Sequence, residues 1–443
     1  MSAPASSSKP QARLPLEGVR VVDLTLVWAG PSATMFLGDW GADVLKVESI
    51  QHFQTASRGN VARPTPEEMK ALRSWRHAYP NDEPGERPWN RFSLFQNHSR
   101  NKRSFTVDLR RPEGMEVFES VLRVSDVLVE NNVPSTAEGL GISYEWARSI
   151  TPDIVLVRMP AYGLDGEYKN YRSYGSHVEA VSGHTYIRGY PDLDMSGKDE
   201  VLFADASGGL VAAFAVVSAL HRRRRTGEGA SIELSLVENM VPSIGEAIMD
   251  YTMNGRVQET LGNRHPYRVP QGCYPCQGDD RWVTISVGDH GEWRRFARAI
   301  GRAGLLDDPR FRTVTARWRH HDELDEIIAQ WTRRHDPYEA MERLQQAGVT
   351  AGAVISDADA YRDPHLADRR FFQTITPSDL GTYPYPGIRW RASATPNSIR
   401  QPPIRLGEHN PYVYRELLGV SGETYDRLER EGHIGEEYAA HIK

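Results

Sequence analysis

An acidic side chain, Asp205, stands in the segment 201–209, directly before the apolar run 210–220. The pattern predicts a strand-like stretch that delivers the carboxylate to a Ser-Gly-Gly turn, and this turn opens a helix. Backbone N–H groups at a helix start lack intrahelical partners, and the helix dipole favours negative charge there. A carboxylate in this place can act as a nucleophile. The alternative is that Asp205 only caps the helix, which is the commonest role of an aspartate at such a position.

Near the amino end of the chain a strand, a turn, a helix and a second strand follow one another. The β-branched run 18–24 precedes Ala29-Gly30-Pro31, a helical stretch 32–40 and an apolar strand 43–47. Pro31 is expected at the first helical position, where its missing N–H costs nothing. The alternation continues with strands at 104–109, 126–130, 153–158 and 230–236 and with helices at 112–124, 143–149 and 237–251.

This alternation predicts an α/β fold with a doubly wound, Rossmann-like parallel sheet. No G-x-G-x-x-G follows the first strand, so a dinucleotide-dependent oxidoreductase has little support.

Composition divides the chain into four parts. Residues 1–15 are polar and typical of a disordered tail. Residues 16–253 are expected to form the first part of a large domain, 254–350 a smaller α+β domain, and 351–443 a return segment that completes the large domain. Within the large domain, the Pro-rich and charged stretch 51–91 is interpreted as a long surface excursion, and such loops are often functional.

The bulk properties exclude several classes of protein. A net charge of -6 disfavours a protein that coats nucleic acid. No apolar stretch reaches the roughly 20 residues that span a bilayer, so no membrane partner is expected. Two cysteines, Cys273 and Cys276, suit a reducing cytoplasm, where we expect this protein. A single C-x-x-C pair fits two small loop residues better than a zinc site, so no metal is expected.

Several sequence blocks together resemble the family III CoA-transferases, the group of formyl-CoA and carnitine CoA-transferases. The resemblance covers nearly the whole chain from Leu16 to Gly419. The blocks lie at 18–31, 37–48, 101–109, 129–131, 226–229, 262–266 and 406–409.

The resemblance implies a CoA-transferase with Asp205 as its nucleophile, with a CoA thioester as substrate and with no tightly bound cofactor. It also implies a dimer of interlocked chains. The carboxylate would attack an acyl-CoA thioester, expel the thiolate and leave a mixed anhydride, which the thiolate attacks again. Backbone amides of Gly208 and Gly209 are candidates for binding the oxyanion. The CoA contacts implied are Val27, Trp28, Ala29, Lys102, Arg103, Asn131 and Leu236, with CoA phosphates near the two basic residues.

Some positions depart from the pattern of the formyl-CoA enzymes. Trp28 replaces a glutamine, Gly175-Ser176 replaces a Tyr-Glu pair, and Gly139 replaces a phosphate-contacting arginine. Recognition of oxalate or formate is therefore not expected. The segments 162–166, 174–175 and 181–183 are closer to transferases acting on substituted succinates, which implies such an acid as the acceptor.

Two other functions remain as alternatives. An α-methylacyl-CoA racemase needs a histidine whose aligned position here is Gly175, with His177 two residues later. His177 is either an acid/base partner or a structural residue, and Tyr174 and His177 are candidates for the wall of the acid-binding pocket. The chain could also be a catalytically silent acyl-CoA-binding subunit. A homodimer is expected, with a hetero-oligomer containing a paralogous subunit as the alternative.

Overall fold

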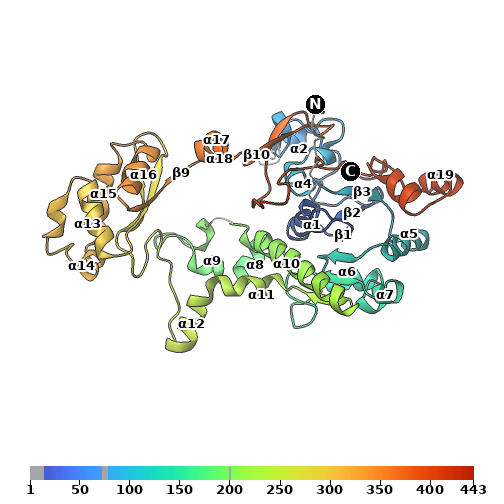
Figure 1. Ribbon diagram of the computed structural model, residues 1–443, viewed down its shortest axis with the longest axis horizontal. Coiled ribbons are helices and arrows are strands. Elements are labelled where there is room, and N and C mark those ends of the chain that lie inside the picture. The colour runs from blue at the N-terminus through green and yellow to red at the C-terminus, as the bar shows by residue number, and fades with distance from the viewer. Residues whose placement is uncertain (1–13, 72–77, 199–200) are drawn as a thin grey trace, which may run out of the picture. The chain divides into compact units, whose positions relative to one another are not determined.

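The computed structural model describes residues 14–71, 78–198 and 201–443, and these form two compact units (Figure 1). Unit 1 contains the described residues up to His184, those from 201 to Gly245, and Phe371–Lys443. Unit 2 contains 185–198 and Glu246–Arg370. The predicted disordered tail lies almost entirely outside the described residues.

Unit 1 is built on a six-stranded parallel sheet in the order β3-β2-β1-β4-β5-β6. Its strands are β1 (Arg20–Leu24), β2 (Asp43–Glu48), β3 (Arg103–Thr106), β4 (Val127–Glu130), β5 (Val155–Arg158) and β6 (Ala230–Glu233). This order is that of a doubly wound Rossmann-like sheet. The predicted α/β fold with a parallel sheet is therefore confirmed, and each strand lies within or next to a run predicted from the sequence.

Helices cover both faces of this sheet because successive strand side chains point to opposite sides. Val21 packs with α1 (Ala29–Asp39), α10 (Phe203–Thr226) and α11 (Leu236–Met240). Val22 packs on the other face, with α5 (Pro112–Arg123), α7 (Tyr144–Ile150) and α19 (Gly422–Arg430). Trp28 is the N-cap of α1, so Pro31 is the third helical residue and not the first, but it still lies in the first turn, where its N–H is not needed.

Shorter elements complete unit 1. They are α2 (Pro66–Ala71), η1 (Pro80–Asp82), η2 (Pro88–Asn90), α4 (Ser93–His98), α6 (Pro134–Gly139), α8 (Gly175–Val181), η4 (Val241–Ile244), η6 (Tyr412–Leu417) and the antiparallel pair β10 (Phe372–Ile375) and β11 (Tyr383–Pro386).

The stretch 51–91 is partly exposed, as a surface excursion would be, but several of its residues are buried and anchor it to the rest of unit 1. Trp89 is 2% exposed and packs with Tyr438 near the carboxyl end of the chain. Arg58 is fully buried, and its guanidinium donates to Glu48 and lies over the ring of Phe95. A buried arginine paired with a carboxylate anchors this segment to the end of β2. Residues 72–77 lie outside the described part.

Unit 2 contains an antiparallel sheet of β7 (Gln271–Pro275), β8 (Trp282–Ser286) and β9 (Thr350–Val354). Its helical segments are α9 (His184–Ile187), η3 (Met195–Gly197), α12 (Gly245–Asn254), α13 (His290–Ala299), η5 (Ala303–Leu306), α14 (Val314–Arg319), α15 (His321–Thr332), α16 (Pro337–Gln346), α17 (Asp357–Arg362) and α18 (Pro364–Asp368), with the first residues of α9 and α12 belonging to unit 1. The predicted boundaries at 254 and 350 therefore differ from those of the structure. β9 hydrogen-bonds to β8, so the strand that was assigned to the return segment belongs to unit 2.

The helix α10 is longer than the apolar run 210–220. It is the one helix in the described ranges that is long and apolar enough to cross a membrane by length and composition, and half of its most apolar stretch is buried within the structure. A core helix of a globular unit passes the same test, and α10 packs directly on α1.

Candidate active site

A pocket of about 500 Å³ lies at the carboxyl end of the parallel sheet of unit 1. Three of its lining segments follow β1, β4 and β5 directly, at 26–28, 131–136 and 159–161. The rest of the lining comes from 172–177, Asp205 and Leu236. In the strand order, β2 and β3 lie on one side of β1, and β4 to β6 lie on the other. Open α/β sheets bind ligands at this kind of switch point, so the fold alone marks the pocket as a ligand site.

The turn after β1 is held in an unusual conformation. Val27 has φ 65°, which a β-branched residue rarely adopts. Its N–H donates to Ser57 Oγ at 2.8 Å. Asn131 Oδ1 accepts from the Leu26 N–H at 2.7 Å, and Asn131 Nδ2 donates to the Leu26 carbonyl at 2.8 Å. Backbone strain of this kind persists only where surrounding groups enforce it, and it concentrates at functional sites. Asn131 therefore shapes the pocket by fixing the turn.

Trp28 forms part of the pocket wall. It lines the pocket, and its ring centroid lies 5.3 Å from that of His98. Burial, together with the charge of Lys102, lowers the pKa of His98 to about 3, so this imidazole is neutral at physiological pH. Ala29, the first residue of α1, is buried and does not line the pocket. Leu236, at the start of α11, does line it.

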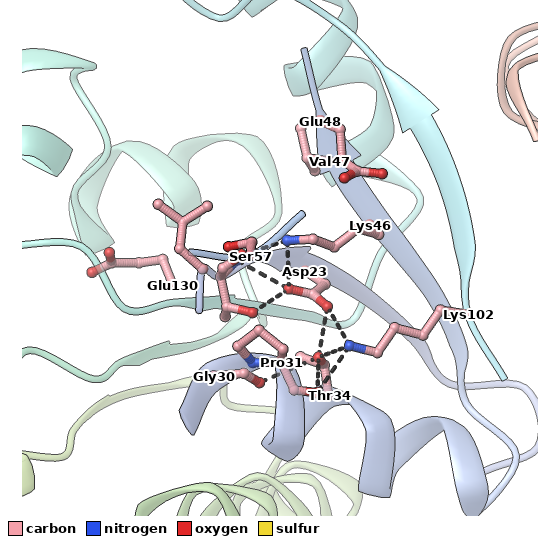
Figure 2. A network of polar contacts seen from close by, with 12 residues as sticks. Asp23, Gly30, Pro31, Thr34, Lys46, Val47, Glu48, Ser57, Lys102 and Glu130 are labelled. Carbon is pink, nitrogen blue, oxygen red and sulfur yellow. Dashed lines mark hydrogen bonds and ion pairs between the residues drawn. The ribbon is translucent and has the colours of Figure 1, made fainter. Parts of the chain in front are cut away.

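Lys102 lies in a buried polar network and not at the pocket surface (Figure 2). Its Nζ donates to Asp23 Oδ2 at 2.9 Å, to the Pro31 carbonyl at 2.9 Å and to Thr34 Oγ1 at 2.8 Å. An ammonium group has three donors, and all three are used. The expectation that Lys102 binds a CoA phosphate is therefore wrong, because the group has neither exposed surface nor a free donor.

Asp23 is the centre of this network. Lys46 Nζ lies 3.5 Å from Asp23 Oδ1 and also donates to the Thr25 carbonyl. Burial alone would raise the pKa of Asp23, but the charges of Lys102 and Lys46 and the hydroxyls of Thr25 and Thr34 hold it well below its usual value. The network ties the end of β1 to β2 through Lys46 and to α1 through Pro31 and Thr34 (Figure 2).

Replacing Lys102 with methionine is expected to destabilise unit 1 by about 2 kcal/mol. Breaking a buried ion pair usually costs about 3 to 5 kcal/mol, and Lys46 remains near Asp23 to reduce this. Denaturant unfolding followed by circular dichroism measures the change. Arg103→Met is the matched control on the neighbouring residue, and because its ion pair is partly exposed we expect a loss below about 1 kcal/mol. Equal losses in the two variants would contradict the role of the network.

Arg103 also lies away from the pocket. Its Nε is 2.9 Å from Asp43 Oδ1, and its guanidinium lies 4.3 Å from the ring centroid of Tyr412. Arg103 and Asp43 are the first residues of β3 and β2. They therefore lie at the amino end of the sheet, opposite the ligand-binding edge, so Arg103 cannot bind a phosphate in this pocket.

Asp205 lines the pocket as the third residue of α10 and is 8% exposed. The predicted strand and Ser-Gly-Gly turn are wrong, because α10 already begins at Phe203. The simple alternative that Asp205 is the N-cap is also wrong, since Leu202 holds that position. The carboxylate nevertheless lies in the first turn of a long helix, where the dipole favours its charge.

Gly208 and Gly209 lie inside α10 and not in a turn. Amides at these positions bond to carbonyls four residues earlier, so the expectation that they face an oxyanion is wrong. An added Cβ would lie 2.5 Å from Leu236 Cδ2 at Gly208 and 2.8 Å from the Ala29 carbonyl oxygen at Gly209. The two glycines therefore allow α10 to pack closely against α11 and α1.

Gly175, the first residue of α8, lies directly beside the Asp205 carboxylate. A Cβ built on it would lie 2.1 Å from Asp205 Oδ2, so the carboxylate occupies the space of the missing side chain. Tyr174 precedes it as the N-cap of α8 and is 54% exposed, and its N–H donates to His177 Nδ1 at 3.3 Å. Tyr174 and His177, the candidates for the wall of the acid-binding pocket, both line this pocket. One nitrogen of His177 is engaged with the backbone of α8.

Two further charged residues near Asp205 were missed. Arg172 lines the pocket, where it and Asp205 are the residues with a formal charge at neutral pH. Glu179 is fully buried on α8 and bonds to the first amides of α10. No local pattern identifies Glu179, because its contacts depend on α8 lying against α10.

A larger hollow, of about 590 Å³, lies over the sheet of unit 2, but its lining has fewer side chains that could take part in catalysis. Its lining consists of small, polar and apolar residues without a carboxylate or a basic side chain. Burial raises the pKa of the Cys273 thiol in this lining, which keeps the thiol protonated and poorly nucleophilic. The described ranges hold no cluster of three or more His, Cys, Asp or Glu residues placed to bind a metal ion.

Comparisons with known proteins identify the family of the chain. The model of "CoA-transferase family III" matches residues 16–410. The chain is 30% identical to the succinyl-CoA–D-citramalate CoA-transferase of Chloroflexus aurantiacus over 96% of this chain and 98% of that one. It is 32% identical to the beta subunit of the succinyl-CoA–L-malate CoA-transferase of the same organism over 94% and 97% of the two chains.

A solved structure shows the same fold. The crystal structure of a CAIB/BAIF family protein from Brucella suis matches with a TM-score of 0.76 at 28% identity, covering 91% of this chain and 100% of that one. The family model, the relatives matched along nearly their whole length and this fold agree with one another. The chain therefore belongs to CoA-transferase family III and is an enzyme of the CoA-transferase type.

Proposed function

We propose that this enzyme moves CoA from an acyl-CoA donor to a carboxylic acid, with Asp205 as the nucleophile. The observation that carries the proposal is a carboxylate in the first turn of α10 that lines a pocket at the switch point of the sheet. A carboxylate oxygen attacks the thioester carbonyl, the carbon–sulfur bond breaks, and an aspartyl anhydride and a CoA thiolate result. The thiolate attacks the aspartyl carbonyl, which releases the donor acid and leaves an aspartyl-CoA thioester. The acceptor carboxylate attacks this thioester, expels the CoA thiolate and forms a new anhydride with Asp205. The thiolate then attacks the acceptor carbonyl of the anhydride, which gives the new acyl-CoA and frees the Asp205 carboxylate.

The oxyanion of each tetrahedral intermediate needs hydrogen-bond donors. The turn that leads into α1 supports this role better than Gly208 and Gly209 do. Among the described residues, no acceptor is bonded to the amides of Trp28, Ala29 and Gly30, and Trp28 lines the pocket. The fixed conformation of Val27 supports donors that are already oriented before the substrate binds.

The CoA nucleotide is assigned to a second pocket, of about 380 Å³, that shares Leu26, Asn132 and Thr136 with the first. It lies beyond the carboxyl ends of β1, β2 and β3, and it contains the exposed Arg110. Arg110 therefore replaces Lys102 and Arg103 in our assignment as the basic residue near a CoA phosphate. The pantetheine arm then extends along Val27 and Trp28 toward Asp205.

A dicarboxylic acid is the acceptor class that the pocket supports best. A dianionic acid approaching Asp205 needs a cation for its distal carboxylate, and Arg172 is the cation of the lining. The relatives carry the names of transferases that act on citramalate, malate and glutarate, all of them dicarboxylic acids. These observations support the substituted succinate that the sequence resemblance implied.

Arg172→Gln should lower kcat/KM for dicarboxylic acceptors by about 10- to 100-fold, because a charge-assisted hydrogen bond contributes roughly 1.5 to 3 kcal/mol. The loss should be less than about threefold for monocarboxylic acids of equal chain length, for example butyrate against succinate. Steady-state assays with one acyl-CoA donor measure both values. Equal losses for the two classes, or a rise confined to the KM of the donor, would contradict the assignment.

The test of the function is a screen of acyl-CoA donors against acids, with the new thioester detected by mass spectrometry. Run in deuterium oxide with a 2-methylacyl-CoA, it also tests the racemase alternative. We expect new thioesters without deuterium at the α-carbon, since Gly175 offers no proton-carrying group. Rapid α-exchange that His177→Ala abolishes would establish the racemase. If the purified chain is inactive and a co-expressed paralogue restores activity, the silent-subunit alternative holds.

A homodimer remains our proposal for the assembly. Leu210 and Phe214 are 48% and 69% exposed on one side of α10, and Phe203, two helical turns before Leu210, is 44% exposed. Such an exposed apolar row on a helix whose opposite side packs in the core supports a protein partner. Light scattering after size exclusion measures the mass. The relatives that are named alpha and beta subunits support a hetero-oligomer as the second outcome.

A further inference from the structure

The amino end of α10, which carries Asp205, is capped by a side chain from another helix. Leu202 is the N-cap residue, with φ 57° and ψ 29°, and leucine offers no side-chain acceptor. Oε1 of Glu179, on α8, accepts from the N–H of Phe203 at 2.6 Å and from the N–H of Ala204 at 3.3 Å. Asp205 is the next residue. The first amides of a helix need such acceptors to keep its end ordered.

The same face of α8 contacts this turn at a second point. Gly175 precedes Glu179 by four residues, so the two lie one above the other on the helix. A Cβ at Gly175 would lie 2.1 Å from Asp205 Oδ2. One face of α8 thus holds the backbone before Asp205 through Glu179 and borders the Asp205 carboxylate at Gly175.

The burial of Glu179 shows that this contact is specific. The residue is 0% exposed, and a buried carboxylate is unfavourable unless it is hydrogen-bonded. The two amides and the positive end of the α10 dipole compensate for its charge. Its Oε2 lies 3.8 Å from His184 Nδ1.

We propose that Glu179 is a positioning residue for Asp205. Its carboxylate fixes the first turn of α10, so that the Asp205 carboxylate faces the pocket in the orientation needed to attack a thioester. The inference rests on Asp205 being the nucleophile. Glu179 itself forms no bond to substrate and transfers no proton.

The experiment compares kcat and both KM values in Glu179→Ala, Glu179→Gln and a matched control, Glu292→Ala. Glu292, in unit 2, is also buried and accepts from two backbone amides, those of Gly288 and Thr350, each at 2.7 Å. We expect Glu179→Ala to lose about 100-fold in kcat with both KM values within about twofold, because misplacing a catalytic group by 1 Å can have this effect. Glu179→Gln, which keeps an acceptor oxygen, should stay within about fivefold of wild type. Glu292→Ala should lower the unfolding temperature with little change in kcat.

Two outcomes would overturn the proposal. If kcat in Glu179→Ala matches that in Glu292→Ala, Glu179 is only a structural cap. If Glu179→Gln is as defective as the alanine variant, the negative charge of Glu179 is what kcat requires, and an acceptor oxygen that fixes the first turn of α10 is not sufficient. Should Glu179→Ala fail to fold, Glu179→Asp takes its place, and its shortened side chain must reduce kcat more than Glu179→Gln does.

Asp205→Ala in the same assay separates the proposal about Glu179 from the proposal about the nucleophile. If Asp205→Ala remains active, the assignment of Asp205 as the nucleophile is wrong. If Asp205→Ala is inactive while Glu179→Ala has normal kcat, only the positioning role of Glu179 is wrong.

Discussion

Asp205→Ala is expected to lower kcat by roughly 10⁴-fold or more, because removal of a covalent nucleophile typically has an effect of this size. That loss corresponds to about 5.5 kcal/mol of transition-state stabilisation. Affinity for the acyl-CoA should change little, since the carboxylate is one small part of a pocket of about 500 Å³. Steady-state kinetics and a direct CoA-binding titration measure the two quantities.

Trapping provides a second measurement on the wild-type enzyme. Incubation with an acyl-CoA followed by hydroxylamine should convert the Asp205 carboxylate to a hydroxamate, which peptide mass spectrometry detects. Glu423→Ala is the matched control for Asp205→Ala, because Glu423 also lies in the first turn of a helix, α19, and does not line the pocket. Activity in Asp205→Ala above a small percentage of wild type, or a hydroxamate on another residue, would refute the assignment.

Gly175→Ala is expected to reduce kcat by at least about 100-fold. The new methyl group would lie 2.1 Å from Asp205 Oδ2 and 2.9 Å from Asp205 Cγ, so the carboxylate must move by more than 1 Å. A displacement of this size at the reacting group is worth about 100-fold in rate. The KM of the acyl-CoA should stay within about threefold, because the nucleotide pocket does not include this residue.

Gly422→Ala is the control for this substitution. Gly422 is also the first residue of a helix, and no heavy atom lies within 4 Å of its built Cβ. Wild-type kinetics in both variants would show that the carboxylate has room to move. The same measurement addresses the racemase alternative, since any side chain at position 175, histidine included, competes with Asp205 for space.

Most strands of the parallel sheet were predictable because they are short runs rich in apolar or β-branched residues. Val127–Glu130 and Val155–Arg158 are largely buried, as central parallel strands must be. The location of the pocket then follows from the strand order, since ligands bind where that order reverses. Asp205 was singled out from the sequence as the candidate nucleophile and lies in this pocket, although its local structure was predicted incorrectly.

The roles of several charged residues were not predictable. Lys102 belongs to a type that is almost never fully buried without a partner, so an exposed, phosphate-binding lysine was the reasonable expectation. Its burial depends on Asp23, 79 residues earlier, whose carboxylate receives it at 2.9 Å. Glu179 is equally ambiguous, because the backbone N–H groups that donate to it lie 24 and 25 residues away on another helix.

The sequence by itself determined the secondary structure of the sheet, the family and the identity of the candidate nucleophile, because these depend on local hydrophobic periodicity and on ordered motifs. Only the tertiary structure decided which charges face the pocket and which stabilise the interior. It placed Lys102 in the interior, Arg103 at the opposite edge, Arg172 in the pocket wall and Gly175 against Asp205. The physical reason is that a charged side chain takes its role from its partners and its exposure, and residues distant in sequence supply both.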